Sequence, residues 1–146
     1  MNQPAFSQQT FERLLSNPKD ETIQDIIEEE NGNFLLAGRN IINESSIISG
    51  YILQLDSFGD VLFESTSFPI GDYSWFSSVY KINDSYFLLG TIKETMDPYN
   101  DMLWYLKLNP DLQVVDQKTF PLPMNRWFSY INSIIDSDTN FVLTGY

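Results

Sequence analysis

Two tryptophans, Trp75 and Trp127, recur in the same short motif, because each is followed by Phe and Ser. An exposed indole face is a flat apolar surface on which a sugar ring can stack. The same recurrence is also typical of a residue that packs at the start of each unit of a repeated structure. The pair therefore indicates either ligand stacking or packing, and repetition at one register favours packing.

A second candidate is the acidic segment that runs from Asp97 to Asp101. Carboxylates at this spacing can hold Ca²⁺ through their oxygens. The segment lacks the twelve-residue ligand loop of an EF-hand, so a solvated acidic loop is the favoured interpretation. We therefore expect no metal site and no cofactor. Paired carboxylates could also hydrolyse a glycosidic bond, but no pattern selects one pair among the 20 acidic residues.

The composition excludes several kinds of chemistry. The chain of 146 residues has no Cys and no His, which removes disulfides, thiol nucleophiles, the usual zinc and copper sites and a Ser-His-Asp triad. Its net charge of −12 would repel a nucleic-acid backbone and an anionic membrane surface, so neither is an expected partner. No stretch is apolar enough for a membrane span, and residues 1–10 lack the features of a secretory signal.

The segments that must position the candidate residues recur along the chain. Phe-Leu-Leu begins at Phe34 and again at Phe87, and Phe-Val-Leu begins at Phe141, at nearly equal spacing. Tyr-Ile-Leu-Gln-Leu-Asp from Tyr51 matches Trp-Tyr-Leu-Lys-Leu-Asn from Trp104 at the same spacing. The agreement of separate segments predicts a tandem repeat with a period of about 53 residues.

Each repeated unit has the pattern of four antiparallel strands, because apolar and polar residues alternate between short turn sequences. The alignment makes Leu35, Leu88 and Val142 equivalent, and it places Leu55 and Leu108 in a core between neighbouring sheets. In the second unit we expect strands over residues 75–82, 86–93, 102–109 and 112–120.

The motif string resembles a known class of repeats. Phe-Leu-Leu-Ala-Gly from Phe34, followed by Gly-Tyr-Ile-Leu-Gln-Leu-Asp-Ser-Phe-Gly-Asp from Gly50, is similar to the β-propeller repeats of kelch and galactose-oxidase type found in long secreted or surface proteins of Bacteroidota. The resemblance covers residues 11–146. It implies an all-β fold of four-stranded blades and an extracellular or cell-surface location. It implies no activity, because function depends on sites added to a fold.

From this resemblance we expect one partial, open β-propeller domain over residues 1–146, about two and a half blades long. Closed propellers have roughly four to eight blades, so the arc would be incomplete. Residues 5–15 can be read as a short amphipathic helix, but the repeat register favours an outer strand. The expected divisions are an outer strand of a preceding blade in 1–20, blades in 21–68 and 74–120, and a truncated blade in 127–146.

In such an arrangement, the links between strands two and three and the links between blades share one upper face. Loops on a rigid scaffold commonly carry binding sites. The candidate ligand-binding residues on these links are Asp72, Tyr73, Trp75, Asp97, Tyr99, Arg126 and Trp127.

The leading functional expectation is a non-enzymatic scaffold for protein or glycan recognition, with no catalytic residues. The alternative is a fragment of a propeller glycoside hydrolase or a related carbohydrate-active enzyme. The expected protein partners are the remaining propeller blades, or other copies of the chain bound through the open sheet edges.

Overall fold

The first four strands of the chain form an antiparallel meander, in which each strand pairs with the next. They are β1 (Asp20–Glu28), β2 (Phe34–Ile42), β3 (Ile47–Leu55) and β4 (Val61–Ser65). The residues that the computed structural model describes are 20–42, 47–66, 68, 73–93, 101–122, 132–135 and 140–144.

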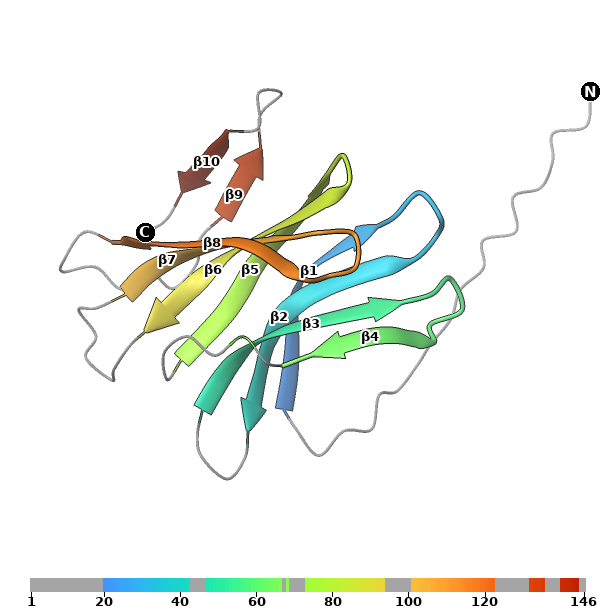
Figure 1. Cartoon of the computed structure of the whole chain (residues 1–146). Helices are drawn as coiled ribbons and strands as arrows, with labels where there is room; N and C mark the ends of the chain where they lie inside the picture. The colour runs from blue at the N-terminus through green and yellow to red at the C-terminus, as the bar shows by residue number, and fades with distance from the viewer. Residues whose placement is uncertain are drawn as a thin grey trace, which may run out of the picture.

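A second meander of four strands follows, and a hairpin follows that. The two meanders share one parallel bridge between Ile48 and Tyr73, which makes them one open, unclosed sheet. Figure 1 shows the three groups of strands following one another from blue-green through yellow-orange to red. The later strands are β5 (Tyr73–Ile82), β6 (Ser85–Lys93), β7 (Asp101–Leu108), β8 (Val114–Pro121), β9 (Asn132–Ile135) and β10 (Phe141–Thr144).

The all-β prediction is confirmed, and the four strands predicted for the second unit agree with β5–β8 to within two residues at each end. Sequence reasoning could find them because the period-2 alternation is clear: from Trp104 to Leu108 of β7 every second side chain is buried. The outer strand or helix expected before residue 20 lies outside the described residues.

The main core lies between the two meanders. We call the face of the first meander that carries Leu35, Ala37 and Ile52 its front. These side chains belong to one buried cluster with residues of the second meander. The largest buried side chain is Trp104 on β7, which is 0% exposed. Its ring stacks on Phe76 with the ring centres 4.5 Å apart. The front of the first meander therefore packs against the face of the second that we call its back.

The opposite, back face of the first meander carries a smaller apolar cluster of Tyr51, Leu53 and Leu55. Leu55 is 7% exposed and Leu108 is 0% exposed, so both are buried, but the predicted place between two sheets is confirmed for Leu108 alone. Leu108 belongs to the core between the meanders. Leu55, its match in the first meander, points away from that core, because it lies on the back of its own meander.

Several local features of the first meander recur at matching positions of the second. A β-bulge lies between Ile23 and Asp25 where β1 pairs with β2, and another lies between Phe76 and Ser78 where β5 pairs with β6. A bulge adds one residue to a strand and increases its local twist. The first strand of each meander therefore bends at the same place in its length.

A glycine faces each bulge from the neighbouring strand. A Cβ atom on Gly38 would lie 1.9 Å from the carbonyl oxygen of Thr22, and one on Gly90 would lie 2.0 Å from that of Trp75. No side chain fits at such a distance from the backbone, so both positions require glycine. This explains why a glycine follows the Phe-Leu-Leu segments in the sequence.

The turns between strands three and four are also alike. In both, a backbone N–H donates back to the residue that opens the turn, from Gly59 to Asp56 and from Leu112 to Asn109. Gly59 has φ of 83° and Leu112 has φ of 59°. The positive φ that the sequence suggests for Gly59 is thus present, and Leu112 takes the same region despite its side chain.

The equivalence of Leu35 and Leu88 is wrong by one residue. Leu88 pairs with Leu106, whose match in the first meander is Leu53. Leu53 pairs with Leu36, so Leu36 is the equivalent of Leu88. The reason is that five residues separate the paired Glu28 and Phe34, whereas four separate the matching pair Lys81 and Tyr86. A shift of one residue moves a side chain to the other face of a strand, so Leu35 and Leu88 lie on opposite faces of their meanders.

The β9–β10 hairpin covers part of the front of the second meander. The ring of Phe141 lies 6.0 Å from the rings of Tyr80 and Tyr105. The hydroxyl of Tyr80 contacts the Ser133 hydroxyl at 2.8 Å. The alignment groups Val142 with the core residues, but Val142 is 48% exposed. It follows Phe141 in the strand, so its side chain points to the opposite side of the hairpin.

Candidate functional site

A pocket opens where the two meanders meet at the edge that holds the ends of β2 and β6 and the starts of β3 and β5. Its volume is about 400 Å³, within the range of small-molecule sites. Two of its residues come from the first meander and three from the second, and they lie within a few residues of the strand ends. The lining residues are Arg39, Ile48, Tyr73, Trp75 and Lys93.

The aromatic side of the pocket is built by one strand. Tyr73 and Trp75 are alternate residues of β5, so their side chains leave the same face of the strand about 7 Å apart. Ser74 between them points the other way and its hydroxyl accepts a hydrogen bond from the N–H of Gly50 at 3.1 Å. Both aromatic residues are half-buried, so part of each faces solvent.

The cationic side comes from two strands. Lys93 Nζ lies 3.1 Å from the Asp101 carboxylate, and both side chains are largely buried. Arg39 is half-buried, and its Nε atom is buried without a hydrogen-bond partner in the described part of the chain. A buried donor that lacks a partner costs about 1–3 kcal/mol. The pocket therefore combines a fixed ammonium with a guanidinium that has spare donor capacity.

The structure brings two of the predicted ligand-binding residues together and adds two that the sequence did not select. Tyr73 and Trp75 line the pocket, with Arg39 and Lys93. Trp75 is half-buried and Phe76 holds the core position at the start of β5, so both interpretations of Trp75, packing and ligand stacking, stay open. The predicted residues that lie outside the described part of the chain are Asp72, Asp97, Tyr99, Arg126 and Trp127.

The segment weighed as a calcium site lies outside the described residues except for Asp101. The Asp101 carboxylate is buried against Lys93. In the ranges that are described, no group of three acidic side chains gathers in a way that could hold a metal ion. Asp101 thus acts as the partner of a lysine at the pocket.

A second pocket, of about 500 Å³, lies between the front of the second meander and the β9–β10 hairpin. It is mainly apolar, and Phe120 at its rim is 47% exposed. Its lining residues are Leu89, Leu103, Tyr105, Lys118, Phe120, Asn140 and Phe141.

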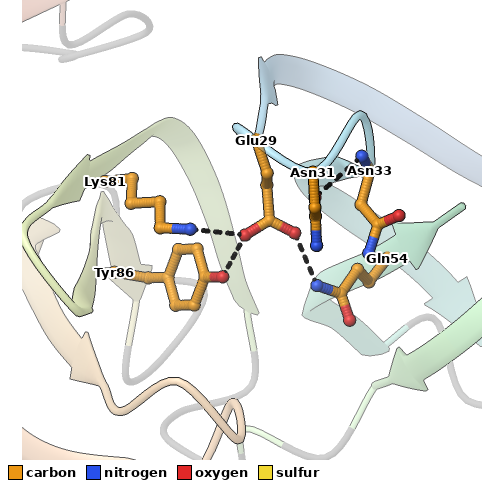
Figure 2. A network of polar contacts seen from close by, with 6 residues as sticks. All are labelled: Glu29, Asn31, Asn33, Gln54, Lys81 and Tyr86. Carbon is orange, nitrogen blue, oxygen red and sulfur yellow. Dashed lines mark hydrogen bonds and ion pairs between the residues drawn. The ribbon is translucent and has the colours of Figure 1, made fainter. Parts of the chain in front are cut away.

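A buried carboxylate links the two meanders away from both pockets. Glu29, in the turn after β1, is 4% exposed. Its carboxylate accepts hydrogen bonds from the Tyr86 hydroxyl, from Lys81 Nζ at 2.9 Å and from Gln54 Nε2 at 2.7 Å. Figure 2 shows Glu29 between Gln54 of the first meander and the Lys81–Tyr86 pair of the second. We interpret this network as a structural contact, because its carboxylate is fully occupied by protein groups.

Burial by itself would raise the pKa of Glu29, but the hydrogen bonds from Tyr86, Lys81 and Gln54 outweigh it and hold the pKa below its ordinary value of 4.5. A carboxyl with a lowered pKa stabilises the fold at pH values above its unfolded-state pKa. That contribution is lost as the pH falls through the lower, folded-state value. The network therefore strengthens the contact between the meanders at neutral pH and weakens it in acid.

Replacing Glu29 with Gln tests this contact. We expect Glu29→Gln to lower the free energy of unfolding at pH 7 by about 1–3 kcal/mol, because at least one donor loses its acceptor. The difference from the wild type should shrink below pH 4.5. Urea unfolding followed by fluorescence at submicromolar protein measures both. Asp116→Asn, in the exposed Lys118–Asp116 pair, is the control and should change little. Equal stability of Glu29→Gln and wild type at pH 7 would contradict the network.

The comparisons with known proteins add no relative. No family model matches the chain, and the search of curated proteins found no similar protein. Across the described ranges, no helical segment has the length and apolar character that a membrane crossing requires. Function must therefore be argued from the pockets and the faces of the meanders alone.

Proposed function

We propose that this chain is a segment of a β-propeller that serves as a non-enzymatic recognition scaffold, with the pocket between Arg39 and Trp75 as its ligand site. The ligand would be a glycan or a protein surface group. The observation that carries the proposal is the convergence of two aromatic and two cationic side chains from both meanders on one pocket.

The propeller part of the proposal is supported by how the meanders repeat. The bulge in the first strand, the glycine that faces it and the turn between strands three and four recur at matching positions of the two meanders. The front of the first meander packs against the back of the second. Contacts to the next unit recur as well. The carboxylate of Asp25 in the first meander accepts a hydrogen bond from the N–H of Val79 in the second at 2.8 Å. Ser78 is the match of Asp25, and its hydroxyl lies 2.9 Å from Ser133 Oγ in the following hairpin. Such nearest-neighbour contacts are typical of repeat architectures.

The recognition part is supported by the chemistry of the pocket. Half-exposed aromatic rings supply contact area at low conformational cost, and Arg39 and Lys93 supply directed donors. Hydrolysis of a glycosidic bond would need two carboxyl groups about 5–10 Å apart on either side of the ligand. Neither described pocket has Asp or Glu among its described lining residues. This favours recognition over the alternative of a glycoside hydrolase.

The proposal is tested by probing a panel of immobilised neutral and acidic oligosaccharides with the wild type and with the Tyr73→Ala/Trp75→Ala double variant. We expect the wild type to bind at least one member, and the double variant to lose about tenfold or more in affinity, because both stacking surfaces are gone. Phe58→Ala, which removes a 66% exposed ring in the turn at the opposite end of β3 from Ile48, is the matched control. Unchanged binding by the double variant, or release of reducing ends by the wild type, would contradict the proposal.

A further inference from the structure

The described lining of the pocket carries positive charge in a chain that is strongly negative. The chain has 8 basic and 20 acidic residues, yet two of the basic ones, Arg39 and Lys93, line this single small pocket. No Asp or Glu is among the described residues of the lining, and the Asp101 carboxylate lies 3.1 Å from Lys93 Nζ. Charge of one sign gathered in a pocket selects ligands of the opposite sign.

The guanidinium of Arg39 has the feature that an anionic ligand would satisfy. Its Nε is buried without a partner in the described part of the chain, while the residue as a whole remains half-exposed toward the pocket. A carboxylate or sulfate can accept two parallel hydrogen bonds from a guanidinium, which a single neutral hydroxyl cannot do. Binding of such a group to the part of the guanidinium that faces the pocket would therefore gain charge-assisted hydrogen bonds.

Lys93 adds a second positive group whose position is fixed. Its ammonium lies 3.1 Å from the buried Asp101 carboxylate, so the long side chain is held at the end of β6. An ammonium is a compact positive charge that a nearby anion can approach from several directions. Because Asp101 balances the charge of Lys93, the positive charge open to a ligand belongs mainly to Arg39. We therefore assign charge recognition to Arg39 and support to Lys93.

The opposite wall indicates what carries the negative charge. Tyr73 and Trp75 leave the same face of β5 at backbone positions about 7 Å apart, so two aromatic side chains line this wall. A linear acidic side chain such as glutamate would reach Arg39 but would leave this wall uncovered. We propose that the pocket binds an acidic sugar unit, with its carboxylate or sulfate on Arg39 and its ring over Trp75. This inference rests on the proposed function and names the ligand class of the same site.

Isothermal titration calorimetry with trigalacturonate and with neutral galactotriose tests the inference. We expect trigalacturonate to bind at least about tenfold more tightly, because only it can make the charge-assisted pair. Arg39→Gln should remove this preference, so that the two trisaccharides bind the variant within about twofold of each other. Arg39→Lys should keep part of the preference, and circular dichroism confirms that each variant is folded. Lys118→Gln, which removes an exposed lysine elsewhere, should leave both affinities unchanged.

Each other outcome has a separate meaning. If both trisaccharides bind equally, or Arg39→Gln still prefers trigalacturonate, the acidic-sugar inference is wrong, while loss of binding in Trp75→Ala would leave the proposed function standing. If triglutamate binds as tightly as trigalacturonate, the site recognises acidic peptide and the sugar assignment is overturned. Tighter binding of a sulfated trisaccharide than of trigalacturonate would assign the anion as sulfate within the same class. Absence of binding by every probe, including the neutral one, would overturn both the inference and the glycan part of the proposed function.

Discussion

Gly38→Ala and Gly90→Ala should each lower the free energy of unfolding by more than about 3 kcal/mol, at or above the upper end of the range for overpacking. A Cβ at these positions would lie 1.9 and 2.0 Å from a backbone oxygen, so no side-chain rearrangement can relieve the clash. The strand pairing at each bulge would have to open. Urea unfolding of both variants measures the loss, and the two values should be similar because the geometry is the same.

Two other glycines calibrate this result. Gly50→Ala would place a Cβ 2.7 Å from an atom of the Phe76 ring, so we expect an intermediate loss of about 1–3 kcal/mol. Gly32→Ala meets nothing closer than 3.5 Å but has φ of +83°, and should cost about 1 kcal/mol. If Gly38→Ala or Gly90→Ala cost no more than Gly32→Ala, the close approach at the bulges would be disproved.

Trp104→Ala should cost about 3–5 kcal/mol, since Trp104 is the largest side chain in the core between the meanders and is fully buried. The cavity would open against the Phe76 ring and beside Gly50. Chemical denaturation of the variant beside the wild type gives the value.

A more conservative variant separates packing from hydrogen bonding at the same position. Trp104 Nε1 has no hydrogen-bond partner in the described part of the chain, so Trp104→Phe loses only part of the packing and should cost clearly less than Trp104→Ala. Phe58→Ala, at an exposed position, serves as the control and should stay within about 0.5 kcal/mol. A loss in Trp104→Ala as small as that in Phe58→Ala would show that the meanders are not held together by this core.

The strands could be predicted from the sequence because their signal is local. Alternation of apolar and polar residues defines β7 without knowledge of any partner, and the turn glycine Gly59 marks the end of β3. The register of strand two could not be predicted, because it depends on the length of the preceding link. An alignment by residue type matched Leu35 with Leu88, whereas the strand pairing matches Leu88 with Leu36.

The site was predictable only in part, for a physical reason. Tyr73 and Trp75 stand out as aromatic residues where a unit begins, whereas Arg39 is isolated in the sequence from every residue it meets in the pocket. Its role arises from the packing of one meander on the other. One signal was present: Arg39 and Lys93 are basic residues near strand ends in a chain with few of them. The remaining predicted residues, such as Arg126 and Trp127, stay predictions.

The two faces that meet in the main core are not alike. The front of the first meander offers the small Ala37 and the bare backbone of Gly50, and the back of the second offers Trp104. A contact between two unlike faces is heterologous, which means that the units are arranged head to tail. Repetition of such a contact has two geometric outcomes: a ring, where the rotation per step divides a full circle, and an unbounded helical stack, where it does not. The angle set between these two meanders therefore decides whether an assembly built from such units closes.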